Sequence, residues 1–404
     1  MTVYRFHLQN DHDLRKALSL TGADARSMPY FDQKREILAF HLADIDFRAA
    51  NALKQEMLSR DGDAIVHRGA IDGSVARCDV ILMGTRKVFS SLLEKLGAMP
   101  YWGLDVVREE LEAATGAANI RKWEIPLPGR PPLDLGGRTA IMGIINVNDS
   151  SFYSGSRAST TEACADMAEK MDMEGADIID LGAESTRPGS TPLSGPEERD
   201  RLIPAIKAVR ERVPEALISA DTYRADTASE AIEAGADIIN DISGGIFDPL
   251  MFPLLARTGN PVVIMHAMEV PDGMHKKYAY RDLIGEITAF FFDRIRSAAE
   301  AGISPQSVIL DPGIGFSKNS SQSLEVIAQI DSFSTLGRPI LVGHSRKSSI
   351  GRVLELDKPS ERLEGTLAIS AFCAMKEVPL VRVHDVGQNL RAVKMIEALK
   401  GGKA

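Results

Sequence analysis

The sequence predicts an α/β protein, a (β/α)₈ TIM barrel preceded by a smaller α/β domain, and three observations support this fold class. Eight short apolar runs recur between residues 139 and 384, and each ends in or carries a polar residue. Successive runs end about 20 to 45 residues apart, which leaves room for one returning helix each time. A segment rich in proline and glycine separates these runs from the first part of the chain. Eight strands that each lead into a helix form a barrel of about 250 residues.

Each predicted barrel strand ends in a side chain that can bind or react. In chain order these ends are Asn146, Asp180, Asp221, Asn240 with Asp241, His266, Asp311, His344, and Arg382 with His384. Residues 159–176, 199–213 and 226–236 show the apolar spacing that is typical of helices. Because the carboxyl ends of the strands form the active-site face of such a barrel, we expect the polar ends to converge on one pocket.

The break between the two domains is predicted at residues 121–137. This stretch, RKWEIPLPGRPPLDLGG, cannot sustain a helix or a central strand and is expected to be a linker. Residues 138–404 then form the barrel, and residues 1–120 form an accessory domain whose role stays open. In that domain the apolar spacing predicts strands at 37–42 and 79–84, a weaker strand at 3–8, and helices at 47–60 and 86–97.

The composition is that of an ordinary globular protein, with 44% hydrophobic and 25% charged residues. A net charge of −9 and a pI near 5.5 argue against nucleic-acid and anionic-membrane partners. No apolar stretch is long enough to cross a bilayer, and the N-terminus lacks the apolar core of a signal peptide. Three scattered cysteines fit a reducing compartment. We therefore expect a cytoplasmic protein.

Four polar, glycine-rich loops follow predicted strands, at residues 146–157, 184–192, 311–319 and 343–352. The fourth carries Ser345, Arg346, Lys347 and Ser348 at the start of a predicted helix. Free backbone N–H groups and the positive end of a helix attract anions, and barrel enzymes commonly bind them after strand seven. Together with Arg382 and His384, this loop predicts a basic, anion-binding side of the pocket.

Acceptor groups balance that basic side. Asp221, Asn240 and Asp311 end the third, fourth and sixth runs, and a buried carboxylate needs a donor-rich partner. A pterin or purine ring presents a guanidine-like edge that carboxylates bind in bidentate fashion. The alternative is an internal Asp–Arg–Lys network without a ligand. Acceptors on one side and anion-binding groups on the other predict a heterocycle tethered to a phosphate.

Seven motifs that run in order through residues 139–399 resemble the signatures of the dihydropteroate synthase family. They are GIINV…SF…SG, GAESTRPG, ISADTYRADTASEAIEAGADIINDISGG, IMH, LDPGIGF-K, GHSRKSSIG and RVHDV. The resemblance implies displacement of diphosphate from a hydroxymethyl-dihydropterin ester by the amine of p-aminobenzoate, with Mg²⁺ on the leaving diphosphate. It also implies a homodimer.

The resemblance assigns a role to each matching position. Asp221, Asn240, Asp311 and Lys347 are implied to hold the pterin ring, with Met265 packing on it. The diphosphate site falls on Asn146, Arg382 and His384, and Asn146 also meets Mg²⁺. Thr186, Arg187, Pro188, Phe316 and Ser348 are implied to surround p-aminobenzoate. The catalytic set comprises Asp149, Lys347, Arg187 and Asn146.

The first loop departs from the family pattern, which usually reads Asn-Val-Thr-Pro-Asp-Ser-Phe. This chain has Asn148, Asp149 and Ser150 in its centre, so the acidic residue comes one position earlier and the proline is lost. Asp149 takes over the role of the family's acid, or the acceptor is an amine other than p-aminobenzoate. A third interpretation is a pterin-binding protein without catalytic activity.

Overall fold

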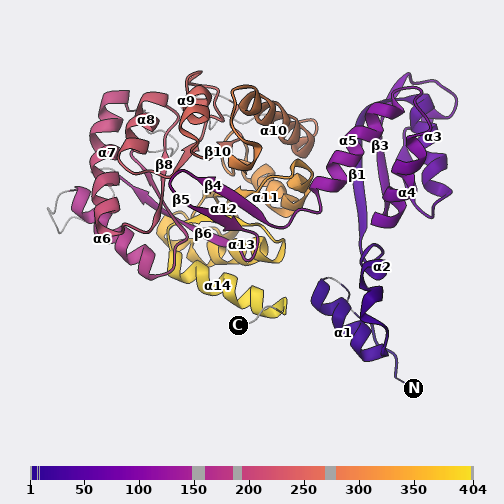
Figure 1. Ribbon diagram of the computed structural model, residues 1–404, viewed down its shortest axis with the longest axis horizontal. Helices are drawn as coiled ribbons and strands as arrows, with labels where there is room; N and C mark the ends of the chain where they lie inside the picture. Colours follow the sequence, from indigo (N-terminus) through magenta and orange to yellow (C-terminus); the bar gives the residue numbers. More distant parts are fainter. Residues whose placement is uncertain are drawn as a thin grey trace. The chain divides into compact units, whose positions relative to one another are not determined.

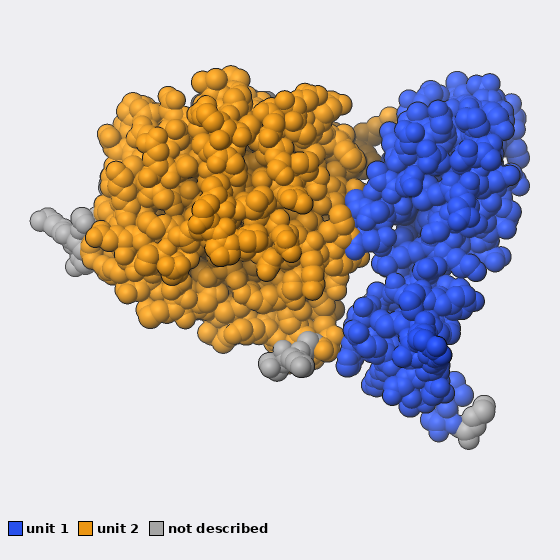
Figure 2. Space-filling view, viewed as in Figure 1, with its two compact units in different colours: residues 1–119 blue, residues 120–404 orange. Residues whose placement is uncertain are grey.

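The computed structural model describes residues 2–6, 8, 10–147, 160–184, 193–268 and 279–401. The chain divides into two compact units, Met1–Asn119 and Ile120–Ala404 (Figure 2). Each unit buries a hydrophobic core of its own.

The second unit is built on the eight predicted parallel strands (Figure 1). Their order is β11-β10-β9-β8-β7-β6-β13-β12, and a parallel bridge between Leu310 and Ile340 joins the two ends of the sheet. The (β/α)₈ barrel is therefore confirmed. The strands are β6 (Ala140–Asn146), β7 (Ile178–Gly182), β8 (Leu217–Asp221), β9 (Ile238–Asp241), β10 (Val262–Met265), β11 (Val308–Asp311), β12 (Leu341–Val342) and β13 (Leu380–Val383).

Helices return the chain between these strands and cover the outside of the barrel (Figure 1). Two of them begin with a capping box, α7 at Ser194 and α11 at Asn319. In each, the side chain of the N-cap residue accepts from the backbone N–H three residues later, and the side chain of that later residue accepts from the backbone N–H of the N-cap residue. The barrel helices are α6 (Thr160–Met173), α7 (Gly195–Arg212), α8 (Ala225–Glu233), α9 (Met251–Thr258), α10 (Leu283–Glu300), α11 (Ser320–Ala328), α12 (Ser348–Leu354), α13 (Leu363–Met375) and α14 (Val386–Leu399).

The expected linker contains a hairpin, β4 (Trp123–Leu127) and β5 (Arg130–Leu135). Its apolar side chains join the inward-facing residues at the amino end of the barrel in one cluster. Prolines are tolerated here because a two-stranded sheet has only edge strands. Gly129 makes the turn at a φ of 71°, a backbone conformation that favours glycine.

Two aspartates from the repeated phrase Gly-Ala-Asp lock the amino end of the barrel. Asp177 accepts a hydrogen bond from the backbone N–H of Ile141 at 2.8 Å, and Asp237 accepts one from Ile218 at 2.8 Å. Each also pairs with an arginine, Asp237 with Arg210 at 2.6 Å. The aspartate of each Gly-Ala-Asp phrase thus has a structural role at the amino end of the barrel, opposite the carboxyl end where the polar strand tips lie.

The first unit contains a three-stranded antiparallel sheet of order β1-β3-β2. The weaker strand expected at residues 3–8 is not formed among the described residues there, and Val3 and Tyr4 are largely exposed. Four of its elements, α1, α2, β2 and α5, were not predicted. The elements are α1 (Asp11–Thr21), α2 (Met28–Asp32), β1 (Ile37–Asp46), α3 (Phe47–Leu58), β2 (Asp63–Val66), β3 (Arg77–Thr85), α4 (Arg86–Leu96) and α5 (Leu104–Ala117). In the described parts of both units, no helix has the length and apolar character needed to cross a membrane.

Candidate active site

Arg382 of β13 binds two carboxylates at the carboxyl end of the barrel. Its Nε donates to Asp180 Oδ2 at 2.6 Å, and its Nη2 donates to Asp221 Oδ2 at 2.7 Å. Asn240 Nδ2 also donates to Asp180 Oδ2, at 3.3 Å. Four strands, β7, β8, β9 and β13, therefore bring their polar side chains together around one buried aspartate.

Asp180 was predicted as a strand tip but without a role. In the structure it is fully buried and joins Arg382 to Asn240. A signal for this role was present in the repeated phrase, because Asp180 in GADIID stands where Asn240 stands in GADIIN. The repeat therefore places one polar side chain on β7 and one on β9, and the two are hydrogen-bonded to each other.

The sequence predicted that Arg382 lies on a basic side of the pocket, apart from the acidic side chains. In the structure Arg382 instead binds two aspartates. Burial lowers the pKa of Arg382, but the carboxylates of Asp180 and Asp221 raise it by more, so the guanidinium stays charged. Burial raises the pKa of Asp221, and Arg382 opposes that rise. Opposite charges thus alternate across the pocket, because neither a carboxylate nor a guanidinium is stable in a barrel interior without its counter-charge.

Lys347 lies against the loop that follows β11. Its Nζ donates to the carbonyl of Ile314 and lies 4.2 Å from the centre of the Phe316 ring. Gly315 has a φ of 80°, and a Cβ there would lie 3.2 Å from Lys347 Cδ, so a larger residue would crowd the lysine. Burial lowers the pKa of Lys347 to about 8, an effect that Asp311 opposes.

Asp311 and an apolar cluster complete this part of the pocket. Asp311 Oδ1 accepts from the backbone N–H of Gly313 at 2.7 Å, while burial raises the pKa of its carboxyl group. Met265 and Phe316, both implied as substrate contacts, belong to one cluster with Tyr223. Polar groups that bind a ring edge and apolar groups that pack on a ring face therefore occur together.

Lys318 ends the motif LDPGIGF-K but was assigned no role from the sequence. Its buried Nζ lies 2.8 Å from His266 Nδ1 and donates to the carbonyls of Gly313 and Phe316. Burial lowers the pKa of Lys318 to about 7. Burial and the neighbouring Lys318 lower that of His266 to about 2, so the imidazole is neutral. Lys318 thus fixes the loop that carries Phe316.

Residues of the basic segment after β12 make separate contacts with two neighbouring residues, His384 and Asp385. Ser345 Oγ lies 2.9 Å from His384 Nδ1, which brings the ends of β12 and β13 together. Arg346 binds Asp385 through two hydrogen bonds of 2.9 and 2.7 Å, so it is already paired. Helix α12 begins at Ser348, which is exposed.

Two predicted strand tips do not join the pocket. Asp241 accepts from the backbone N–H groups of Ser243 and Gly245, both at 2.7 Å, and so shapes the loop after β9. His344 is buried with its Nε2 2.9 Å from Ser370 Oγ on α13. Successive residues of a strand point to opposite faces, so Asp241 turns outward where Asn240 turns inward.

Four implied site residues lie outside the described residues: Asp149, Thr186, Arg187 and Pro188. Asn146 is described and ends β6, half-buried. Among the residues that the structure describes, no group of three His, Cys, Asp or Glu side chains could hold a metal ion.

Known proteins resemble this chain in both sequence and structure. The family model described as "Pterin binding enzyme" matches residues 142–384. A dihydropteroate synthase of Synechocystis is 41% identical over 275 residues, which cover 68% of this chain and 95% of that protein. Among solved structures, Xanthomonas albilineans dihydropteroate synthase with 4-aminobenzoic acid has a TM-score of 0.65 at 33% identity, and covers 70% of this chain and 100% of that one.

A longer type of relative also matches. A probable bifunctional folylpolyglutamate synthase/dihydropteroate synthase of Halobacterium salinarum is 38% identical over 363 residues, which cover 89% of this chain. The match is longer than the barrel unit and so includes part of the first unit. The chain spans only 42% of that relative's length.

The chain therefore belongs to the family of pterin-binding enzymes. Its barrel is of the dihydropteroate synthase type, and its class of activity is that of a transferase. The resemblance of the sequence motifs to that family is confirmed.

Proposed function

We propose that this protein catalyses the dihydropteroate synthase reaction and that the pocket residues described above carry it out. 6-Hydroxymethyl-7,8-dihydropterin diphosphate and p-aminobenzoate would give 7,8-dihydropteroate and diphosphate, a step of folate biosynthesis. One observation supports the proposal: Arg382 donates to Asp180 at 2.6 Å and to Asp221 at 2.7 Å, and Asn240 donates to Asp180 at 3.3 Å, so implied pterin and diphosphate contacts meet around one buried aspartate. A Xanthomonas albilineans relative in complex with 7,8-dihydropteroate supports the same substrate class.

The acceptor side chains suit the pterin ring. Asp221, Asn240 and Asp311 would bind its amino-pyrimidine edge, where charge-assisted hydrogen bonds are stronger than neutral ones. Lys347 would donate to an acceptor of the ring, and Met265 would pack on the ring face. Because several rigid strand ends hold these groups, the exocyclic carbon of the pterin is placed before the reaction begins.

The reaction requires that the two substrates be oriented and that the negative charge on the departing diphosphate be stabilised. The bond from the exocyclic carbon to the ester oxygen breaks, and its electron pair leaves with the diphosphate. The amine nitrogen forms the new bond to carbon and releases its proton to solvent. His384, Arg382 and Asn146 would orient the diphosphate, with charge stabilised in a water-poor site. The amine is already nucleophilic, so no strong general base is needed.

A magnesium ion fits this chain best when the substrate brings most of its ligands. Mg²⁺ typically keeps several waters and binds substrate phosphates with few protein oxygens. Asn146 would supply one amide oxygen at the end of β6. When bound, the ion would stabilise the negative charge of the departing diphosphate.

Turnover with defined substrates tests the function. Purified protein with Mg²⁺, the pterin diphosphate and p-aminobenzoate should release diphosphate and form dihydropteroate in equal amounts. Replacing p-aminobenzoate by other aromatic amines tests the alternative acceptor. Absence of diphosphate release with every amine, while the pterin still binds, would favour the pterin-binding protein without activity.

Asp149 is proposed as the acid of the first loop. Asp149→Ala should lower kcat about 10- to 100-fold while the Kd for the pterin changes little, because a group that acts only in the transition state affects kcat and not ground-state binding. Single-turnover kinetics and pterin titration measure the two effects. Ser150→Asp is the control that restores the family's acid position. Equal rates for Asp149→Ala and wild type would exclude a role for Asp149.

We also propose a homodimer formed through the last helices of the barrel, in the cytoplasm. Large apolar side chains are exposed on α12, α13 and α14, and exposed apolar surface of this kind marks interaction sites. They are Val353, Leu354, Phe372, Met375, Met395 and Leu399. Sedimentation equilibrium of wild type and of Met375→Glu would test this state.

A further inference from the structure

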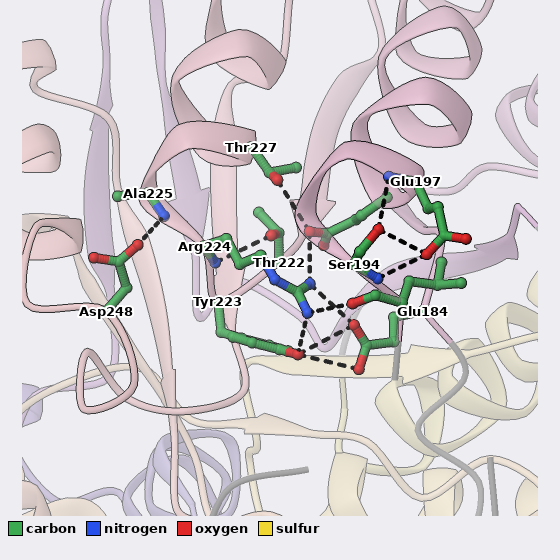
Figure 3. Close-up of polar contacts among 11 residues, drawn as sticks. Glu184, Ser194, Glu197, Thr222, Tyr223, Arg224, Ala225, Thr227 and Asp248 are labelled. Carbon is green, nitrogen blue, oxygen red and sulfur yellow. Dashed lines mark hydrogen bonds and ion pairs between the residues drawn. The ribbon is translucent and has the colours of Figure 1, made fainter. Parts of the chain in front are cut away.

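Lys318 is a buried lysine that forms no ion pair with the residues that the structure describes. Its Nζ meets a ring nitrogen of His266 and two backbone carbonyls instead. Arg224, by contrast, binds two buried glutamates, at 3.0 and 2.7 Å (Figure 3). Burial lowers the pKa of Lys318 by more than the charge of Asp311 raises it. A lysine kept in such a costly environment indicates a functional role, because sequences depart from stable packing mainly at functional sites.

The hydrogen bonds of Lys318 hold both ends of one tight turn, residues 313–316. Its Nζ donates to the carbonyl of Gly313 at 3.3 Å and to that of Phe316 at 3.2 Å. The Gly313 carbonyl also accepts from the backbone N–H of Phe316, at 3.0 Å. Gly313 packs so closely on β10 that a Cβ there would lie 2.2 Å from the carbonyl oxygen of His266. The turn is therefore fixed by the lysine from one side and by the barrel wall from the other.

The backbone directly after this turn is strained. Ser317 has a φ of 51°, a left-handed conformation that is uncommon for a residue with a side chain. It is fully buried, its Oγ accepts from the N–H of Met268 at 3.0 Å, and its carbonyl accepts from the hydroxyl of Tyr280 at 3.0 Å. Such a conformation persists only where its surroundings over-determine it, and it is concentrated at functional sites. The turn thus has a geometry that its buried neighbours impose.

The turn in its own right holds the ammonium group of Lys347. The carbonyl of Ile314, between the two that Lys318 binds, accepts from Lys347 Nζ. The ring of Phe316 has its centre 4.2 Å from the same Nζ, within the range of a cation–π contact. Lys347 is the N-cap residue of α12, so its backbone is fixed, but its four-carbon stem has many rotamers. The position of the Lys347 ammonium therefore depends on the turn.

We propose that Lys318 is a positioning residue for Lys347: it fixes the turn at residues 313–316, whose Ile314 carbonyl and Phe316 ring hold the Lys347 ammonium where it meets the pterin. The inference rests on the proposed function, because it takes Lys347 to bind the pterin. It assigns no contact between Lys318 and a substrate.

A double-mutant cycle of Lys318→Met and Lys347→Ala tests this role. Methionine keeps an unbranched side chain of similar length and removes the three donors. We expect Lys318→Met to raise the Kd for 6-hydroxymethyl-7,8-dihydropterin about tenfold in the wild-type background, the effect of weakening one charged hydrogen bond. In the Lys347→Ala background the same change should alter the Kd by less than about twofold, since residues that act through one another are not additive. Calorimetric titration measures all four values.

Tyr280→Phe disturbs the same backbone from its other side and serves if Lys318→Met does not fold. It removes the hydroxyl that donates to the Ser317 carbonyl and leaves Lys318 in place. The Kd for the pterin should rise about threefold in the wild-type background, the lower end of the effect of one neutral hydrogen bond, and should not change in the Lys347→Ala background.

Glu198→Gln is the matched control, because it removes another buried charge of the barrel away from this turn. Glu198 is 1% exposed and accepts from Arg224 at 2.7 Å and from Thr227 at 3.0 Å (Figure 3). The variant should lower the melting temperature, as Lys318→Met does, and leave the Kd for the pterin within about twofold of wild type.

Four results would overturn the inference: equal losses of affinity from Lys318→Met in both backgrounds, unchanged affinity in both Lys318→Met and Tyr280→Phe, a tenfold loss in Glu198→Gln, or wild-type affinity in Lys347→Ala. If the wild type binds the pterin but releases no diphosphate with any amine, the proposed function fails and the cycle still decides the inference. If the wild type does not bind the pterin, both fail.

Discussion

Lys347→Ala should weaken pterin binding about 10- to 100-fold, the range for losing one charged hydrogen bond in a closed site. The charge of Lys347 interacts favourably with Asp311 and Asp221 and unfavourably with Arg382, so its removal changes the charge balance of the site. Because the implied ring contact persists in the transition state, kcat/KM should fall at least as much as the affinity. Calorimetric titration of a pterin ligand and steady-state kinetics measure the two losses.

The pH dependence of pterin binding gives a second measurement on the same variant. Burial lowers the pKa of Lys347 to about 8, so the lysine is protonated below that pH and loses its charge above it. The wild-type affinity that depends on this charge should therefore fall as the pH rises through about 8. Lys347→Ala should not show this fall.

Arg346→Gln is the control for charge in the same segment. Arg346 precedes Lys347 in the chain but binds Asp385, so its loss should affect stability and leave pterin affinity within about twofold, as expected of a residue without ligand contact. Equal losses of affinity in the two variants would mean that the segment acts only through its net charge.

The fold was predictable because its signals are periodic and local. The eight apolar runs of the sequence coincide with the eight observed barrel strands, and seven motifs in the expected order indicated the family of the barrel. The hairpin at residues 123–135 was missed because a proline normally argues against a strand, and only the two-stranded edge position removes that objection. Helix α5 was missed although it buries Leu104 and Leu111.

The site was only partly predictable because pairing depends on neighbours that are distant in the sequence. Arg382 and Asp180 are 202 residues apart in the chain and come together only when β13 and β7 flank β6. Direction was equally hidden: Asn240 and Asp241 are adjacent, yet the pleat turns one inward and the other outward. A sequence shows which side chains end the strands, whereas the closed sheet decides which of them meet.

Arg382→Met should destabilise the fold by about 3–5 kcal/mol at neutral pH, the cost of leaving buried carboxylates without their counter-charge. The side chain of Asp180 is fully buried and that of Asp221 is 14% exposed, and both bind Arg382. The methionine fills a similar volume, so the loss reports the charge and not a cavity. Urea unfolding followed by circular dichroism measures it.

The double variant Asp180→Asn with Arg382→Met separates charge from packing. Removing the carboxylate should recover about 0.5–3 kcal/mol of the loss, the range of coupling energies for residues in contact. No recovery would mean that Asp180 and Arg382 stabilise the barrel independently of each other.

The loss caused by Arg382→Met should also shrink in acid. Burial already raises the pKa of Asp221 in the wild type, and the charge of Arg382 opposes that rise. In Arg382→Met this opposing charge is absent. A carboxyl group whose folded-state pKa lies above its unfolded-state value costs stability at high pH, and this cost disappears as the pH falls through the folded-state pKa toward the unfolded-state one. The difference from wild type should therefore be smaller at pH 5.5 than at pH 7.5, to be measured over roughly this range by urea unfolding. A difference that stays constant over this pH range would contradict the prediction that the loss comes from leaving the Asp221 carboxylate without its counter-charge.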